Sequence, residues 1–504
     1  PQVDYFSKRG LGLGVNLEWG GIRAFKDHGR AEMRLYGIRD RGDDRKRARD
    51  LGFFPLEREG RGRLHADFTK NFGAGWQLDA IFGSYTDRNF RREFYENEYD
   101  ANLPSNTFLL LTKRYGEFNA FLLAAPRINE FENRTEYLPT LGFDVSRTRV
   151  GDFGLQFSGH TEVSLLRFRP ADNDPRRPIS AVRVDSANWF NLPLDLRWFT
   201  LDPFAGARAT VARDFLTLPQ GSSRPGLSPD GTFPGLAPGV DRRSGLLYRL
   251  LPFFGLHAQT YFTGVFPQAR VPGLGIDGLR HIVMPYVRYT NVAFNSLDEI
   301  RERAFIPFDE VDVLDEFHEV RLGLRNRLQT RQGSGENRRT VDYLDLMVEL
   351  PVYPHPRRDN NNRVFGTLEL AGIWRPAPGF AIATQGFFDL YEGTFIRANA
   401  SFNVDFTDVI RGSLYYRLLR DVHQVVGINV ELTLSEVYGV RFQQEYDLEL
   451  GKFRDTRIEL TRDILEAFTI GFVFVRDASQ GDLGFYVSLA ATFAGPGGSG
   501  NLLR

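Results

Sequence analysis

Apolar and polar residues alternate with a period of two along most of this chain. In the stretch 484–493, Phe485, Val487 and Leu489 take every second position. The positions between them carry Gly484, Tyr486, Ser488, Ala490 and Thr492, and Phe493 closes the stretch. Near the start, Leu11 to Trp19 repeats the pattern, with Gly12, Gly14, Asn16 and Glu18 as its polar set. Because successive side chains of a strand point to opposite faces, each stretch predicts a strand with one apolar face.

The alternation recurs often enough to predict an all-β protein. Helical periodicity is never sustained, and no helix–strand alternation suggests a parallel sheet. Many stretches have the length that a tilted strand needs to cross a bilayer. There are about 23 candidate strands: 11–19, 30–39, 64–69, 76–83, 106–115, 117–126, 137–146, 152–165, 186–200, 203–213, 245–262, 281–290, 319–330, 341–350, 363–374, 379–390, 394–404, 407–417, 424–434, 437–447, 452–462, 466–476 and 482–494.

The connections predict which end of each strand is which. Tight turns alternate with long polar loops. This alternation is expected of an outer-membrane barrel, in which short turns face the periplasm and long loops face outside. The long loops expected outside are 87–105, 166–185, 214–244, 291–318 and 351–362. Bacterial barrels have an even number of strands, so we expect a first strand upstream of Pro1. The last strand would then run toward the periplasm and have an open edge.

The polar faces favour a lumen. Many of their residues are charged: Glu32, Arg34, Asp67, Asp79, Glu431, Arg441, Glu445, Glu449, Arg457 and Glu459. A soluble sandwich shows the same alternation, but usually has strands apolar on both faces or a fixed repeat, and neither is seen. Aromatic residues also gather near strand ends, as interfacial girdles require: Trp19, Phe72, Trp76, Trp198, Phe199, Trp374 and Phe493. A soluble β-structured binding protein remains an alternative, tested by whether the chain extracts only with detergent.

Composition narrows the class further. The chain has 504 residues without a Pro/Gly/Ser linker, a net charge of -1, and no cysteine. The charge gives no electrostatic case for nucleic acid, and the missing cysteines exclude disulfides and thiolate metal sites. The sequence contains no run of about 18 apolar residues, so it predicts no helical membrane span. The opening at Pro1, without a methionine or signal region, is interpreted as the start of an excised piece.

No enzymatic motif emerges. The eight histidines form no metal signature, and no G-x-S-x-G elbow is present. The G-L-G-L-G run at 10–14 lacks the third glycine of a nucleotide loop. We therefore predict a non-enzyme without cofactor or metal. The acidic residues Asp309, Glu310, Asp312, Asp315 and Glu316 suit divalent cations, but a solvated external loop is the favoured interpretation.

Several short stretches resemble the LptD (OstA or Imp) family of lipopolysaccharide-assembly proteins. The most specific is G-L-R-H-I-V-M-P-Y-V-R-Y at 278–289, followed by I-P-F-D-E-V-D at 306–312 and L-G-L-R-N-R-L at 322–328. D-R-N-F-R-R-E-F at 87–94 and T-E-Y-L-P-T-L at 135–141 are also similar. The opening D-Y-F-S-K-R-G resembles the hairpin between the family's first two strands. The signature residues are Arg280, His281, Pro285, Tyr289 and Asp309.

This resemblance implies a transmembrane barrel of about 24 to 26 strands in the bacterial outer membrane. Such a barrel inserts lipopolysaccharide into the outer leaflet through a lateral gate between its first and last strands. It implies partners: an LptE-like plug lipoprotein, a periplasmic lipopolysaccharide-transport bridge and the barrel-assembly machinery, for which Phe493 resembles the terminal signal. We expect the barrel at 1–494 and a flexible tail at 495–504, with the family's periplasmic jelly-roll domain absent from this chain.

Two features bear on transport. Prolines cannot donate a ladder hydrogen bond, so Pro139, Pro193, Pro252 and Pro285 mark weak pairing. The gate itself is expected along 484–493, where small residues offer little packing. The lumen residues Arg34, Arg280 and Arg441 suit lipid phosphates, although pairing with carboxylates across the lumen is favoured. A general diffusion porin remains the rival function, and it needs an open lumen with a charged constriction loop.

Overall fold

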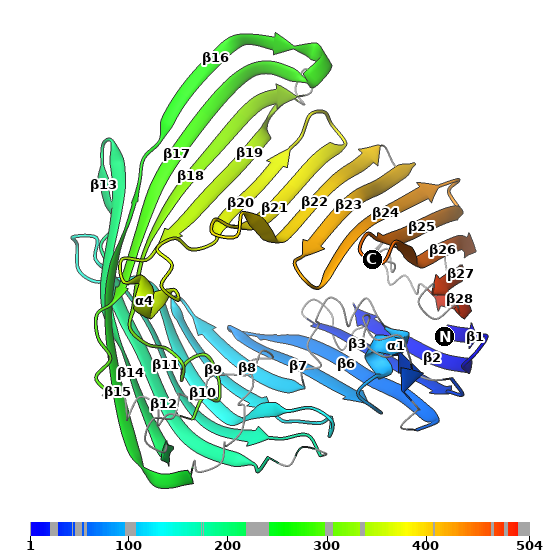
Figure 1. Cartoon of the computed structure of the whole chain (residues 1–504), viewed down its shortest axis with the longest axis horizontal. Helices are drawn as coiled ribbons and strands as arrows, with labels where there is room; N and C mark the ends of the chain where they lie inside the picture. Colours follow the sequence, from blue (N-terminus) through cyan, green and yellow to red (C-terminus); the bar gives the residue numbers. More distant parts are fainter. Residues whose placement is uncertain are drawn as a thin grey trace.

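Alternating sequence becomes strand along nearly the whole chain. The computed structural model describes residues 2–20, 29–42, 44–45, 53–54, 58–95, 107–172, 174, 176–217, 241–297, 306–332, 338–406, 409–464, 468–477 and 482–491. Most of these residues form one antiparallel sheet that curves round and closes on itself (Figure 1).

The strands follow one another in chain order around the sheet. In the first half these are β1 (Gln2–Phe6), β2 (Gly10–Gly20), β3 (Gly29–Arg39), β6 (Gly60–Gly73), β7 (Trp76–Tyr85), β8 (Phe108–Tyr115), β9 (Phe118–Ala125), β10 (Arg134–Arg149), β11 (Gln156–Arg169), β12 (Ile179–Asn191), β13 (Leu194–Leu196), β14 (Phe199–Thr217) and β15 (Asp241–Gln259). In the second half they are β16 (Phe262–Val271), β17 (Ile276–Val292), β18 (Phe317–Gln332), β19 (Arg339–Val352), β20 (Leu368–Trp374), β21 (Phe380–Asp389), β22 (Thr394–Phe406), β23 (Ile410–Leu419), β24 (His423–Thr433), β25 (Tyr438–Asp447), β26 (Lys452–Ile464), β27 (Phe468–Asp477) and β28 (Asp482–Ala491).

The smaller elements lie outside this sheet. Strands β4 (Asp44–Arg45) and β5 (Phe53–Phe54) pair only with each other. Two short α-helices, α1 (Phe90–Phe94) and α4 (Pro356–Asp359), and the 3-10 turn η1 (Pro272–Leu274) lie in connections. None of the helices in the described ranges is both long and apolar enough to cross a membrane.

The sheet closes as a barrel of 24 strands. Its 26 segments include two interrupted strands, because β12 and β13 both pair with β14, and β15 and β16 both pair with β17. All the strands predicted from the alternation are confirmed. The prediction that the first strand lies upstream of Pro1, which would leave the last strand with an open edge, is wrong. β1 pairs with β2 on one side and with β28 on the other, so the first and last strands lie side by side (Figure 1).

Strand ends depart from prediction at a few places. The predicted loop 166–185 shortens to 170–178, because β11 continues to Arg169 and β12 begins at Ile179. Pro193 separates β12 from β13, as its missing N–H donor predicts. The break between β15 and β16 falls at Thr260, opposite Pro285 of β17, which has no N–H to donate; the Thr260 amide still donates to the carbonyl of Pro285 at 3.2 Å.

The connections alternate in length only over part of the chain. Long connections follow β7, β14, β17 and β19 at one end of the barrel, which we call the long-loop end. From β21 onward that end also carries tight turns: residues 390–393, 420–422 and 448–451. The strict short/long alternation expected from the sequence is therefore wrong for the last third of the barrel.

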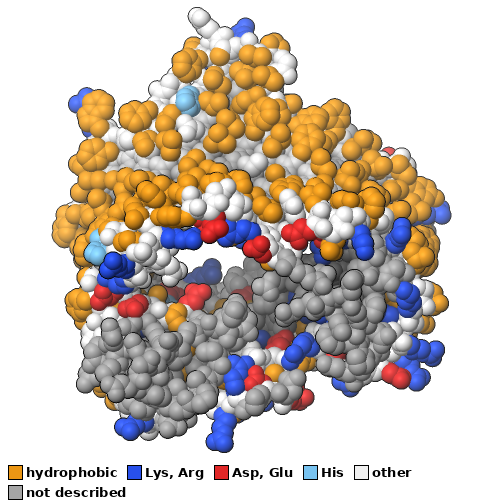
Figure 2. Space-filling model, in the orientation of Figure 1, with side chains coloured by type: hydrophobic (Ala, Val, Ile, Leu, Met, Phe, Trp, Pro, Cys, Tyr) orange, Lys and Arg blue, Asp and Glu red, His pale blue; other side chains and the backbone are white. Residues whose placement is uncertain are grey.

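Side chains divide between an apolar outer face and a polar inner face. On β2, Leu11, Leu13 and Val15 are exposed outward, Leu13 by 57%. Strands in another part of the wall continue this belt, with Leu322 and Leu324 on β18 and Leu346 on β19. Figure 2 shows the belt as a broad hydrophobic surface over the upper part of the molecule, with charged side chains around the opening beneath it. An exposed apolar area of this size needs lipid to cover it.

Candidate functional site

The inner wall is built from polar side chains that pair across neighbouring strands. Arg325 on β18 meets Asp345 on β19 at 2.5 Å, and Arg441 on β25 meets Glu459 on β26 at 3.2 Å. Arg34 donates to Glu32 of its own strand, β3. Two of the three basic residues weighed as lipid-phosphate ligands therefore pair with carboxylates. The third, Arg280, is exposed and has no carboxylate within ion-pair distance in the part of the chain described.

The connection between β17 and β18 folds back into the lumen. We call its described residues 306–316 the inserted loop. Ile306 and Phe308 are buried in a cluster with inward-facing residues of β11 and β12: Leu166, Phe168, Ile179 and Ala181. The inserted loop begins as an apolar run, I-P-F, and this run finds one of the few apolar areas of the inner wall at the long-loop end. Burial of the two side chains therefore anchors the loop at its start.

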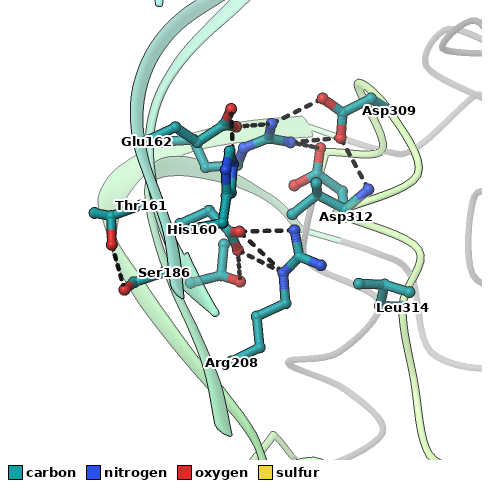
Figure 3. A network of polar contacts seen from close by, with 12 residues as sticks. His160, Thr161, Glu162, Ser186, Arg208, Asp309, Asp312 and Leu314 are labelled. Carbon is teal, nitrogen blue, oxygen red and sulfur yellow. Dashed lines mark hydrogen bonds and ion pairs between the residues drawn. The ribbon is translucent and has the colours of Figure 1, made fainter. Parts of the chain in front are cut away.

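Arg183 of β12 fixes the acidic part of the loop, whose Asp309 and Asp312 are labelled in Figure 3 together with Glu162 of the wall. Its guanidinium is 2% exposed and donates from Nη1 to Asp309 at 2.6 Å and to Asp312 at 2.9 Å. Nη2 donates to the other oxygen of Asp309 at 2.8 Å and to Glu162 of β11 at 2.9 Å. The Tyr137 hydroxyl adds a bond to Asp309 at 2.9 Å. Three carboxylates thus share one buried cation, which is stable only because the bonds are short and numerous.

A second arginine, Arg249 of β15, holds the loop through its backbone. It donates to the carbonyl oxygens of Val311 at 2.7 Å, Leu314 at 3.0 Å and Asp312 at 3.1 Å. It also donates to the Thr210 hydroxyl at 3.1 Å. Five donors in one planar group suit such a fan of carbonyl acceptors. The loop is therefore fixed by charge at its carboxylates and by hydrogen bonds along its main chain.

The wall supports these arginines in turn. Asp185 accepts a bond from Thr210 at 2.7 Å and pairs with Arg208 of β14 at 2.7 Å. His160 of β11 contacts Asp144 of β10 at 2.6 Å and faces Glu162 at 3.6 Å. Figure 3 shows these side chains as one polar network that runs from the strands to the loop. The loop is therefore an integral part of the inner wall.

The two loop carboxylates differ in proton affinity. Burial raises the pKa of Asp312 to about 6, against the opposing pull of Arg183. Burial also acts on Asp309, but its bonds to Arg183 outweigh burial and hold the pKa of Asp309 below its usual value. Asp309 is therefore the firmly ionised partner of Arg183 at neutral pH. Asp312 is the carboxylate whose charge changes close to neutral pH.

The acidic run is neither a simple solvated loop nor a cation site. Asp312 is buried, and Asp309 is committed to Arg183 and Tyr137. Within the described ranges, no group of three or more histidine or acidic side chains is arranged to hold a metal ion. The favoured sequence interpretation, a solvated external loop, is therefore wrong for 306–316. An arginine on a strand over 120 residues away in sequence provides the counter-charge.

The signature residues are spread over several places. On β17, Arg280 lies on the inner face, whereas His281, Pro285 and Tyr289 lie on the outer face. The His281 ring contacts Asn326 at 3.4 Å, and the Tyr289 ring packs edge-on against His318 at 5.3 Å. Only Asp309 belongs to the arginine network. The structure does not bring the five together.

The closing seam is packed from the lumen side. Phe6 of β1 lies 5.3 Å from the Tyr486 ring of β28 and 5.4 Å from Phe94 of α1. Phe90 of α1 is fully buried and joins Tyr36 of β3 in the same cluster. The short helix therefore covers the place where the barrel closes.

Two further buried arginines hold α1 and its neighbouring loops in place. Arg9 pairs with Asp40 at 2.6 Å and with Glu93 of α1 at 2.6 Å. Arg61 pairs with Asp44 at 2.5 Å and with Asp87 at 2.6 Å. The long-loop end thus uses the same device twice, a buried arginine shared among carboxylates of different loops.

The residues predicted along the seam lie on β28 and β2. Gly484 opposes Phe6, Tyr486 opposes Asp4, and Ser488 opposes Gln2. Ala490 pairs with Thr469 of β27, while Thr492 and Phe493 lie outside the described residues. Gly12 and Gly14 lie beneath the Tyr36 ring. Asn16 and Glu18 face the open lumen. Their register partners on β3 are Arg34 and Glu32, respectively.

Sequence reasoning missed the residues that hold the inserted loop. Arg183 and Arg249 were absent from the candidate set, as were Tyr137 and Glu162. A weak signal was present for Arg249, Tyr137 and Glu162, which occupy lumen-facing positions of predicted strands, whereas Arg183 falls in the predicted loop 166–185 and becomes a wall residue only because β12 begins at Ile179. Which loop these residues bind depends on how the strands are arranged round the barrel. The alternation of apolar and polar residues does not encode that arrangement.

The family model described as "LptD: LPS transport system D" matches residues 59–426, more than two thirds of the chain. No curated protein matches the chain. The siderophore receptor PirA from Pseudomonas aeruginosa is similar in structure at 10% identity, with a TM-score of 0.41 over 98% of this chain and 80% of that one.

PirA from Acinetobacter baumannii gives 8% identity and a TM-score of 0.38, with the same coverage of both chains. These values are too low to bear on the function of this chain. The family match covers the strands from β6 to β23 and the first residues of β24, and it includes the signature strand and the inserted loop. The chain therefore belongs to the LptD family of outer-membrane β-barrels that transport lipopolysaccharide.

Proposed function

We propose that this barrel releases lipopolysaccharide into the outer leaflet through its closing seam. The observation that supports the proposal most directly is that β1 and β28 lie side by side in the wall, with five residue pairs from Gln2–Ser488 to Phe6–Gly484. The outer belt of the barrel suits lipid, and its polar lumen suits sugar.

The chemistry of the cargo requires a sideways exit. Lipopolysaccharide combines a bulky anionic sugar portion with several acyl chains. A closed wall would force the acyl chains through water or the sugars through hydrocarbon, and polar groups in hydrocarbon cost several kcal/mol each. An opening between two strands lets the sugars stay in the lumen while the acyl chains enter the bilayer.

The seam has features of a strand pair that can separate. Across the seam, Gly484 of β28 opposes Phe6 of β1 and contributes no side chain to the cross-strand contacts that stabilise a sheet. The packing comes instead from rings on the lumen side, where Phe6 contacts Tyr486 and Phe94. Opening would separate these rings. We propose that α1 acts as the lumen-side fastener of the gate.

Orientation and partners complete the proposal. The long-loop end is proposed to face the outside, with the short turns and the end of β28 in the periplasm. The proposed partners are an LptE-like plug lipoprotein in the lumen, a periplasmic transport bridge that reaches the barrel through a jelly-roll domain, and the barrel-assembly machinery reading Phe493. Co-purification of a small lipoprotein with the barrel would support the first of these.

A cysteine lock across the seam tests the gate. Val3 and Val487 are register partners, and the chain has no native cysteine to interfere. The pair Val3→Cys and Val487→Cys, oxidised in cells that express the complete protein, should abolish delivery of new lipopolysaccharide to the cell surface. Reduction should restore it.

A matched lock controls for general stiffening of the wall. Leu460 and Phe472 are partners on β26 and β27, away from the seam, and both are exposed on the outer face. Oxidised cysteines there should leave delivery intact. Normal delivery through a fully oxidised seam would refute the gate.

The inserted loop leaves one rival to test. A loop folded into the lumen is also what a diffusion porin requires, and charged side chains line this one. The purified barrel in a planar bilayer should show little steady conductance if the lumen is built for a plug and a large cargo. Stable open channels in the absence of any partner would favour the porin.

A further inference from the structure

One part of the inner wall is rich in uncharged amide groups. It is formed by β21–β25, on the side of the barrel that leads from β20 toward the closing seam (Figure 1). A pocket of about 730 Å³ hollows the wall here, and its lining includes Gln385, Asn399, Asn429 and Gln443. We call these four residues the amide patch. Gln443 lies two positions from Arg441 on β25, so strand alternation places the patch on the same lumen-facing side as the Arg441 ion pair.

The strand register brings the four amides together in two pairs. Gln385 and Asn399 are register partners on β21 and β22, and Asn429 and Gln443 are register partners on β24 and β25. Tyr415 of β23 lies between the two pairs. Its ring rests on Gly427, where an added Cβ would meet the ring at 2.2 Å. The close approach keeps the middle of the wall low, and the amides stand at its two sides.

The amide groups are available to a ligand. The side chains of Gln385, Asn399 and Gln443 make no hydrogen bond to any residue that the structure describes, and the first two are exposed. Asn429 donates from Nδ2 to Ser413 at 3.4 Å, but its buried Oδ1 has no donor among the described residues. A buried acceptor without a partner costs about 1–3 kcal/mol. A hydroxyl group of a ligand in the pocket would remove this cost.

The charged groups beside the patch are already paired. Glu445 accepts from the Tyr415 hydroxyl at 2.6 Å and from Arg417 at 2.5 Å. On the other side, Arg441 pairs with Glu459 at 3.2 Å. The patch therefore offers neutral donors and acceptors, whereas the wall around the inserted loop offers charge.

We propose that the amide patch binds the saccharide portion of the cargo through hydrogen bonds to its hydroxyl groups. A sugar hydroxyl both donates and accepts, and each amide side chain offers an acceptor and two donors in one plane. The Tyr415 ring adds a flat apolar surface with a polar end, which suits the C–H groups and hydroxyls of a sugar ring. The pocket volume falls in the range of about 300–1,000 Å³ that small-molecule sites occupy.

The inference rests on the proposed function for the identity of the cargo, and it deepens that function by naming where the sugar is held. Only β26 and β27 separate β25 from β28 in the wall. A sugar on the patch therefore stays in the lumen while its acyl chains enter the bilayer at the seam. Absence of sugar binding in a barrel with a working gate would overturn this inference alone. Delivery through a locked seam would refute the gate and leave the binding site standing.

A titration with a neutral saccharide tests the patch directly. The purified barrel is placed in nanodiscs and titrated with the oligosaccharide of lipopolysaccharide, cleaved from its lipid and freed of phosphate. Saturation-transfer difference NMR detects the sugar protons that contact the protein and gives a dissociation constant. We expect a signal that saturates. A signal that rises in proportion to sugar concentration would overturn the proposal.

Two substitutions on different strands assign the signal to the patch. Asn399→Leu and Gln443→Met keep the approximate size of the side chain and remove its hydrogen bonds. Each should weaken oligosaccharide binding by roughly three- to tenfold, the effect of losing one neutral hydrogen bond. The two variants are independent, so the test survives if one of them fails to fold.

A matched variant controls for amides elsewhere in the lumen. Gln329 of β18 is a register partner of the lumen-facing Arg280, and its amide already donates to Asp342 at 2.8 Å. Gln329→Met should leave the dissociation constant unchanged. Equal affinity in the native barrel and both patch variants would overturn the proposal.

Competition identifies the source of the sugar. Intact lipopolysaccharide must displace the oligosaccharide, whether or not the linear glucan maltohexaose also competes. Displacement by the glucan alone would overturn the assignment to the cargo. Patch variants that weaken a co-purified lipoprotein but not the oligosaccharide would overturn it as well, because the amides would then be contacts of a plug.

Discussion

Arg183 shows what a single buried charge can do on a barrel wall. Its guanidinium is withdrawn from water and faces three carboxylates, two from the inserted loop and Glu162 from the wall. Isolated burial of such a charge would be unfavourable, and the paired arrangement is close to neutral in free energy. Its effect is therefore on conformation, because the loop satisfies the arginine only in its inserted position.

Removing the cation should release the loop. Arg183→Met keeps the apolar stem and leaves Asp309 and Asp312 without their cation. Breaking a buried pair in this way costs about 3–5 kcal/mol. Hydrogen exchange should show loss of protection across 306–316, while strands of the opposite wall stay protected.

A surface pair provides the comparison. Arg39 and Glu59 lie 3.3 Å apart, and their side chains are 74% and 66% exposed. Arg39→Met should cost less than about 1 kcal/mol, as exposed pairs do. Equal loss of protection in the two variants would contradict the role given to Arg183.

The inserted loop should also respond to pH. The pKa of Asp312 rises from 3.8 to about 6 on folding, so the inserted state takes up a proton as pH falls through 6. Insertion therefore becomes more stable from neutral pH down to about pH 5. The lowered pKa of Asp309 works the other way, but only below its unfolded value of 3.8. Exchange of 306–316, corrected for intrinsic rates, should be slower at mildly acid than at neutral pH. Asp312→Asn should flatten the difference.

At the scale of elements, the local alternation predicted most strands well, but it predicted less well where a strand is short or interrupted. The stretch at 452–462 alternates and became β26. β1 was missed because its five residues precede a charged turn and are too few to show a period. The break after β15 lies opposite Pro285 of β17, which the sequence marked as a place of weak pairing, but the sequence does not show which segment lies opposite that proline.

The loops were the least predictable elements. An acidic run such as 309–316 is usually solvated, and nothing local distinguishes it from one that folds inward. Its apolar start, Ile306 and Phe308, is the only local hint. The partner arginines come from β12 and β15, so the site exists only after the wall has formed.

Close strand contact can be tested at Gly323 of β18. The Tyr286 ring of β17 lies over it, and an added Cβ would meet that ring at 2.1 Å. Gly323→Ala should displace the ring and weaken its hydrogen bond to Glu349, at a cost of about 1–3 kcal/mol. Gly37→Ala is the control, because its nearest neighbour would be 3.9 Å away. Urea unfolding of both variants in lipid vesicles compares them, and equal midpoints would contradict the close-contact account.

At the scale of the whole molecule, the two faces of the wall should obey different rules. Leu324 of β18 is exposed on the outer belt, and Ser413 of β23 lies on the lumen face next to Asn429. Leu324→Arg should destabilise the barrel in a bilayer by about 2–4 kcal/mol near the midplane, and less toward either interface. Ser413→Arg should cost little. Folded fractions from heat-modifiable gel mobility after reconstitution measure both, and equal effects would argue against a lipid-facing belt.

Closure between the two ends of the chain has a consequence for folding. Gln2 and Ser488 are neighbours in the wall yet almost as far apart in sequence as the chain allows. The entropic free-energy cost of bringing these two residues together exceeds the cost of closing a ten-residue hairpin by about 3 kcal/mol. Every other strand pair of the described sheet joins segments that are close in sequence, so we expect those pairs to form earlier. The β1–β28 pair is the one that raises the contact order of the fold. The barrel can therefore assemble almost completely as an open, curved sheet. Its last step is the meeting of β1 and β28, the pair with the least to hold it before the ring is complete.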